Sequence, residues 1–135
     1  MAIRTSFRAD SPAGVVVEHE HSDGAAAFAS RCFPHWLDEV ERAASAGTCY
    51  AARAGGDTIA FACHSVNRTG WIGPMATDPE RQRAGVGRSL LGAVCASLAE
   101  AGHVDADIAW VGPIGFYAKA GAVVSRVFRT AKLTL

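Results

Sequence analysis

One stretch of the chain, residues 71–101, constrains the fold more than any other. Residues 71–77 are predicted to form a strand, which Pro79 stops. Apolar side chains then recur every four residues, and this spacing predicts a long amphipathic helix. Two glycines, Gly85 and Gly87, stand where that helix begins. A strand, a tight turn and a long helix in this order predict a domain in which sheet and helix pack together.

The rest of the chain continues this alternation. The other expected elements are a strand at 14–21, helices at 25–32 and 35–46, strands at 48–53 and 58–66, a strand at 106–111, a short helix at 113–120 and a β segment at 122–135. Asp23 is expected to cap the first helix. Pro74 cannot donate to a strand ladder, so it is expected at a bulge or where strands part. The order is mixed α/β, in one domain over residues 1–135.

Composition excludes several classes of protein. Half of the 135 residues are hydrophobic, which is enough for a core. Thirteen basic residues balance thirteen acidic ones, which argues against a nucleic-acid or membrane partner held mainly by charge. No apolar run approaches the roughly 20 residues that span a bilayer, and no signal-peptide pattern follows Met1. We therefore expect a cytoplasmic protein.

The cysteines and histidines do not predict a metal site. Four cysteines are widely spaced in apolar segments, so we expect reduced, largely buried thiols; they are Cys32, Cys49, Cys63 and Cys95. The nearest metal candidate is the alternating run His19-Glu20-His21, which fits an edge strand better than a ligand set. No metal is expected.

The start of the long helix has the chemistry of a phosphate cradle. Backbone N–H groups in the first turn have no intrahelical partner, and the helix dipole adds positive potential there. Glycine at positions 85 and 87 lets an anion approach the backbone, and Arg83 and Arg88 add positive charge. The dinucleotide fingerprint fails because position 90 is leucine, and the P-loop pattern fails because Arg88 follows Gly87.

Two motifs resemble those of the GNAT superfamily of acetyl-CoA-dependent N-acetyltransferases. Gln82-x-x-Gly85-x-Gly87 is similar to the family's Q/R-x-x-G-x-G/A signature, and residues 116–122 resemble its F-Y-x-x-x-G-F segment. The resemblance covers residues 70–122, whereas residues 1–69 fit the family only in outline. It implies a GNAT-like fold, with a central mixed, splayed β-sheet flanked by helices and a gap near Pro74.

The resemblance also implies a site for acetyl-CoA, with no metal. The coenzyme-binding residues that it implies are Met75, Ala76, Thr77, Gln82, Arg83, Ala84, Gly85, Val86, Gly87, Arg88 and Phe116. By the same resemblance Tyr117 donates a proton to the departing thiolate in a direct transfer to an amine, although a core role for this ring is open. Many relatives carry an acidic general base on the strand that residues 71–77 form here, but none stands there.

The acceptor is expected to be an amine-bearing small molecule or peptide. Trp71, Trp110 and His64 are candidates for contacting it, against the alternative that each is a core residue. Two other functions are open: a non-catalytic acyl-CoA-binding or regulatory domain, and one domain of a tandem GNAT protein. A homodimer is possible.

Overall fold

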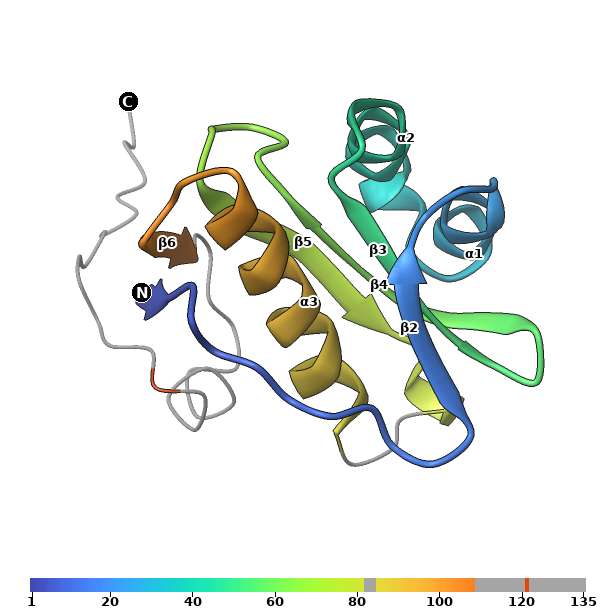
Figure 1. The fold of residues 1–135 in the computed structure, drawn as a ribbon. Coiled ribbons are helices and arrows are strands. Elements are labelled where there is room, and N and C mark those ends of the chain that lie inside the picture. Colours follow the sequence, from blue (N-terminus) through green and yellow to red (C-terminus); the bar gives the residue numbers. More distant parts are fainter. Residues whose placement is uncertain (82–84, 109–120, 122–135) are drawn as a thin grey trace, which may run out of the picture.

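The computed structural model describes residues 1–81, 85–108 and 121, which form a six-stranded mixed sheet and three α-helices (Figure 1). The strand order is β1-β6-β5-β4-β3-β2, and every pair is antiparallel except β5 and β6. The strands are β1 (Ala2–Arg4), β2 (Val15–His19), β3 (Cys49–Ala54), β4 (Asp57–His64), β5 (Trp71–Thr77) and β6 (Asp105–Ile108). The helices are α1 (Gly24–Cys32), α2 (Leu37–Ala46) and α3 (Val86–Glu100), with 3₁₀ turns at Pro34–Trp36 and Pro79–Arg81. This confirms the predicted mixed α/β class.

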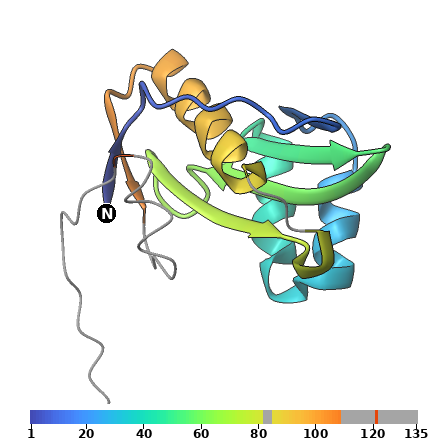
Figure 2. The same ribbon diagram turned by 90° about the horizontal axis from the view of Figure 1, so that it is seen from below.

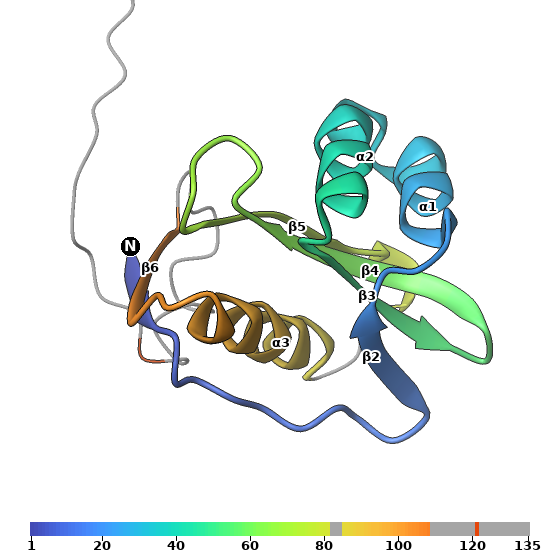
Figure 3. The same ribbon diagram turned by 45° about the horizontal axis from the view of Figure 1, so that its top comes forward.

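Helices cover both faces of the sheet. Figure 3 shows α3 on one face and α1 with α2 on the other. Successive strand residues point to opposite faces, so β4 serves both layers: Ala60 and Ala62 pack in the core under α3, whereas Phe61 packs under α1 and α2. The apolar stripe predicted for α3 is buried on this side, including Leu90, Leu91, Val94 and Leu98.

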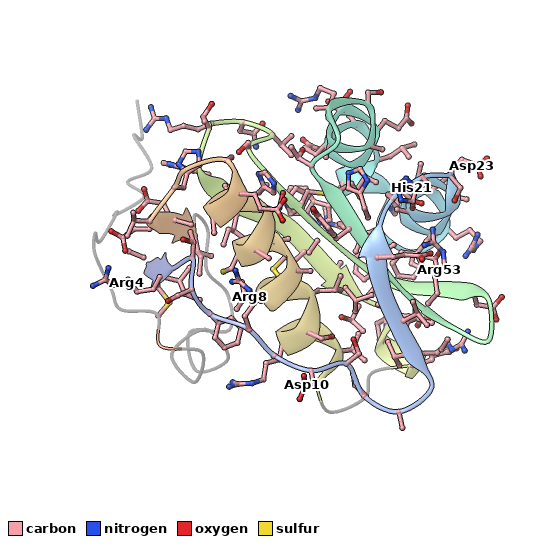
Figure 4. The ribbon with its side chains drawn as sticks, viewed as in Figure 1. Arg4, Arg8, Asp10, His21, Asp23 and Arg53 are labelled. Atoms are coloured by element: carbon pink, nitrogen blue, oxygen red, sulfur yellow. The ribbon has the colours of Figure 1, made fainter. Side chains whose placement is uncertain are left out.

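Strand β1 was not expected from the sequence. It pairs with β6, and Ile3 is its one buried residue. From β1 the chain runs along α3 to β2, as Figures 1 and 2 show. We call residues 5–14 the N-terminal strap. Gly92 of α3 allows its close approach, because a Cβ at that position would lie only 2.9 Å from the Ala9 backbone nitrogen. Arg8 lies on this strap, across α3 (Figure 4).

The predicted cap of α1 is wrong in its residue. Asp23 occupies the N-cap position but makes no side-chain hydrogen bond there. Instead the Glu20 carboxylate accepts the Ala25 N–H at 2.6 Å. Glu20 also accepts a hydrogen bond from Arg53 of β3, which points toward this corner of the molecule (Figure 4). A contact between β3 and the residue that directly follows β2 thus fixes the start of the helix.

The expectation for Pro74 is confirmed. The register of β4 and β5 shifts between Ala62 and His64, which pair with Met75 and Ile72, so Gly73 and Pro74 form an irregularity in the ladder. The expectation for the cysteines holds for Cys49, Cys63 and Cys95, which are buried and reduced. It is wrong for Cys32, which ends α1 with its side chain in solvent.

The elements expected at 113–120 and 122–135, and the end of the strand expected at 106–111, lie outside the described residues, apart from Gly121. Among the helices that the structure describes, none combines the length and the apolar character that crossing a membrane requires.

Candidate functional site

The start of α3 has the form of the predicted phosphate cradle. Gly85 is its N-cap and adopts φ 94°, a left-handed conformation that glycine takes without strain. The cap makes no side-chain hydrogen bond. The first intrahelical bond runs from the Ser89 N–H to the Gly85 carbonyl at 2.9 Å. The N–H groups that precede it in the first turn therefore suit an anion, and the residues present fit a pyrophosphate.

Arg88 adds a cation to this turn of α3. Its guanidinium lies 5.0 Å from the centre of the Phe7 ring on the N-terminal strap, a cation–π contact. The strap also lies against the cap, because a Cβ added at Gly85 would be only 3.4 Å from Pro12 Cγ. Val86, the next residue of the helix, is buried in the core. Of the other predicted loop residues, Gln82, Arg83 and Ala84 lie outside the described part of the chain.

Strand β5 leads to this turn and carries the residues expected along the coenzyme arm. Met75, Ala76 and Thr77 are partly exposed, and each pairs with β4 on one side. On the other side, β5 pairs with the described part of β6 only at Trp71 and Ile72. The sequence of β5 contains no acidic residue, as noted above.

His64 occupies a structural position. The residue is 4% exposed, with Nε2 2.8 Å from Ser97 Oγ on α3 and Nδ1 2.9 Å from Ser65 Oγ. Burial, together with the nearby His103, lowers the pKa of His64 below 6.5. Both ring nitrogens are therefore engaged, and the contact of Nε2 joins β4 to α3, which favours the core role over contact with an acceptor.

The other predicted contacts to an acceptor are only partly placed. Trp71 is partly exposed at the start of β5, with the Arg68 guanidinium 5.0 Å above its ring. Trp110, Phe116 and Tyr117 lie outside the residues that the structure describes. The structure therefore places Trp71 at the first residue of β5, beside β6, but does not test its grouping with the aromatic residues farther along the chain.

Sequence reasoning missed Glu39 of α2. In the sequence it stands next to Asp38 and close to Glu41 and Arg42, in a run rich in charge. In the structure its Oε2 atom is buried, and no hydrogen-bond partner for it is found among the described residues. No periodic pattern distinguishes Glu39 from its exposed neighbours Asp38 and Glu41, so only the folded structure reveals it.

Within residues 1–81, 85–108 and 121, no group of three or more His, Cys, Asp or Glu side chains is arranged to hold a metal ion. Comparison with known families decides the chain's class, since the model of the acetyltransferase (GNAT) family matches residues 13–122. The chain belongs to this family. The predicted family is confirmed, and the match extends well before the motif region at 70–122. The curated proteins compared with this GNAT chain contain no match.

Solved structures share the GNAT fold with this chain. A GNAT family N-acetyltransferase from Escherichia coli, solved with CoA, is 20% identical with a TM-score of 0.60, over 84% of this chain and 71% of that one. AAC(6')-Iy, in complex with a CoA bisubstrate analogue, is 17% identical with a TM-score of 0.64, over 89% of this chain and 99% of that one.

Some structural relatives are much longer than this GNAT chain. A GCN5-related N-acetyltransferase from Sphaerobacter thermophilus is 17% identical with a TM-score of 0.68. The match covers 89% of this chain but 45% of that one. The chain spans less than half the length of the first structures that it matches.

Proposed function

We propose that this chain is an N-acetyltransferase that transfers the acetyl group of acetyl-CoA to an amine by direct attack within a ternary complex. The observation that carries the proposal is the start of α3, where Gly85 holds a left-handed cap without a side-chain hydrogen bond. Family membership supports it, because the chain belongs to the acetyltransferase (GNAT) family. The complexes of the E. coli protein with CoA and of AAC(6')-Iy with a CoA analogue support coenzyme A as the cofactor.

Each part of the site has a role in this proposal. The N–H groups of residues 85–88 would bind the pyrophosphate, with the charge of Arg88 beside them. The backbone of Met75–Thr77 would bind the pantetheine arm as an added strand does, and an amide there would stabilise the oxyanion. Bound acetyl-CoA supplies an acyl group activated as a thioester. Tyr117 would donate the proton that the leaving sulfur needs, a role proposed from the family resemblance.

A binding test comes first. Calorimetry with CoA should show association with the wild-type protein, and Gly85→Val should abolish it, because a β-branched residue opposes the left-handed cap. Circular dichroism would show that the variant is folded. Gly55→Val, in the β3–β4 turn, is the control for a left-handed glycine away from the cradle. Retention of CoA affinity in Gly85→Val would refute the cradle.

A turnover test separates catalysis from binding alone. A panel of amines is incubated with acetyl-CoA, and the released thiol is measured. The exposed Cys32 would react with thiol reagents, so the assay uses a Cys32→Ser background. Tyr117→Phe should lower kcat, and unchanged turnover in this variant would remove the proposed role of Tyr117.

The absence of an acidic residue on β5 favours one rival, a non-catalytic CoA-binding domain. CoA binding without acetylation of any amine in the panel would support that rival.

A further inference from the structure

Arg88 stands where a helix disfavours positive charge. It is the third residue of α3, and the helix dipole adds positive potential at that end. The first turn contains no acidic residue that would offset the charge. The residue is also exposed, so holding its long side chain in one place costs conformational freedom. A cation that is held at this point of the helix therefore needs a reason other than the stability of α3.

Phe7 of the N-terminal strap holds this cation. The Arg88 Cζ atom lies over the Phe7 ring, 5.0 Å from its centre. The ring is itself anchored, because Phe7 is partly buried and packs against the core under α3. The Phe7 N–H also donates to the Arg4 carbonyl at 3.1 Å. The contact therefore joins an exposed guanidinium to a ring whose position is fixed.

The strap is fastened on both sides of this contact. At its start the Thr5 N–H donates to the Val104 carbonyl at 2.9 Å. Arg8 Nη1 donates to the carbonyls of Thr5 and Phe7, at 2.6 Å and 2.7 Å. Farther along, Pro12 lies beside the N-cap of α3. Figure 1 shows the strap following α3 between these points. The backbone thus presents the Phe7 ring at the same end of α3 as the phosphate cradle.

An aromatic ring suits an arginine that serves a ligand. The ring attracts the guanidinium through its π electrons and carries no hydrogen-bond acceptor atom. It therefore neither occupies an N–H group in a conventional hydrogen bond nor neutralises the charge. A carboxylate in the same place would do both, and it would also repel a phosphate. The contact with Phe7 thus fixes Arg88 and spares the groups with which an arginine binds phosphate.

We propose that Phe7 is a positioning residue for the coenzyme: it holds Arg88 beside the first turn of α3, so that the phosphates of CoA meet a cation already in place. This inference rests on the proposed function. The charge of Arg88 is unfavourable to the helix alone, but it becomes favourable once an anion is bound at the same turn. Because less conformational freedom is then lost on binding, the contact with Phe7 should strengthen the affinity for CoA.

The proposal couples the coenzyme to the strap. If contact between Phe7 and Arg88 strengthens the binding of CoA, bound CoA must favour the docked strap to the same extent, because such coupling is reciprocal. Trypsin can cleave the strap after Arg8, the residue that follows Phe7. CoA should therefore slow cleavage at this bond, which is a readout that does not depend on turnover.

A double-mutant cycle measured by calorimetry tests the inference. Phe7→Leu keeps an apolar side chain against the core and should weaken CoA binding about two- to fivefold, as expected for an exposed cation–π contact. Arg88→Met should weaken it about tenfold. In the Arg88→Met background, Phe7→Leu should have no further effect. Phe7→Tyr keeps the ring and should bind CoA as the wild-type protein does.

Tyr50→Leu is the matched control. Tyr50 is another partly buried aromatic residue that packs against the same core, but its ring contacts His19. The substitution should lower the melting temperature without changing the affinity for CoA. If Tyr50→Leu weakens CoA binding as much as Phe7→Leu does, the effect at Phe7 is one of general stability and the inference is wrong.

Proteolysis tests the coupling without any variant of Phe7. Under native conditions, where local opening of the strap governs cleavage, saturating CoA should slow tryptic cleavage after Arg8 about twofold or more in the wild-type protein. Arg88→Met should remove this protection. Rates with and without CoA are compared within each variant. Protection that persists in Arg88→Met, or that is absent from the wild-type protein, overturns the inference even if Phe7→Leu does not fold.

The two proposals fail differently. Wild-type protein that binds CoA, combined with Phe7→Leu that binds it equally well, overturns the role of Phe7 and leaves the proposed function standing. Effects of Phe7→Leu and Arg88→Met that simply add have the same consequence, because the ring would then not act through Arg88. Wild-type protein that does not bind CoA overturns the proposed function itself, and the role of Phe7 with it.

Discussion

The Arg53 guanidinium donates a hydrogen bond to the Glu20 carboxylate at 2.6 Å, beside the first turn of α1. The Glu20 side chain is 1% exposed and also accepts hydrogen bonds from Ser22 and from the Ala25 N–H. Burial opposes the charge of this carboxylate. The hydrogen bonds from the Ser22 and Ala25 amides and from Arg53 outweigh it and lower the pKa of Glu20. One carboxylate thus joins β2, β3 and α1.

Removing this pair should destabilise the protein. We expect Arg53→Met to cost about 3 kcal/mol or more, because it leaves Glu20 buried without its countercharge. Glu20→Gln should cost about 1–3 kcal/mol at pH 7. Because the pKa of Glu20 is lower in the folded state, its contribution exists above about pH 4.5 and is lost as the pH falls further. Urea denaturation at several pH values measures both effects, with the exposed Glu41→Gln as the control. Equal stability of wild type and Arg53→Met would contradict the prediction.

His64 should make stability depend on pH at a higher range. Because the pKa of His64 is lowered by folding, its ring binds a proton near pH 6.5 in the unfolded chain but stays neutral at that pH in the folded protein. Stability should therefore fall as the pH drops from 7 to 5, by at most about 1.4 kcal/mol per pH unit from this group. His64→Gln should flatten that slope in urea denaturation, and the exposed His35→Gln should not. A slope unchanged in His64→Gln would count against the buried neutral ring.

Gly92→Ala should loosen the N-terminal strap. Alanine is the better helix former by about 1 kcal/mol, but its Cβ would meet the Ala9 nitrogen at 2.9 Å. We expect a net loss of about 1–3 kcal/mol, together with faster tryptic cleavage after Arg8. Ala96→Gly, which lowers helix propensity at a partly buried position of α3, should lower stability without speeding cleavage after Arg8. Stabilisation by Gly92→Ala would show that the strap moves aside at no cost.

The thiols should differ sharply in reactivity. Cys32 is exposed, whereas burial raises the pKa of Cys95 to about 11. The hydrogen bond with Cys49, together with burial, raises the pKa of Cys63. A maleimide at pH 7.5 should therefore add once to the native chain, not at all to Cys32→Ser, and four times after denaturation, as intact mass would show. Modification of a second thiol before unfolding would contradict the buried positions.

Helix α3 was predictable because its information is local. Six apolar residues repeat at helical spacing, and the glycines at both ends mark its limits. Its packing against the sheet then follows from the need to bury that stripe. The same holds for the bulge at Pro74, since proline cannot donate to the ladder whatever surrounds it.

Strand β1 and the cap of α1 were not predictable, because their information is distant. Three residues, with Ile3 alone buried, carry no pattern, and the partner of Ile3 is Ala106 of β6. Asp23 has the right residue type and position for a cap, yet Glu20 takes the role because Arg53, on another strand, fixes it. The orientation of Glu39 likewise depends on packing that no repeat records.

The position of Pro12 beside the cap of α3 makes the neighbouring residue a suitable place for a fluorescent reporter of the site. Ser11 is exposed and stands next to Pro12, so a solvatochromic dye attached there would lie close to Gly85 without occupying it. The emission of the dye could follow loading of the protein in real time, which a slow thiol assay would not resolve.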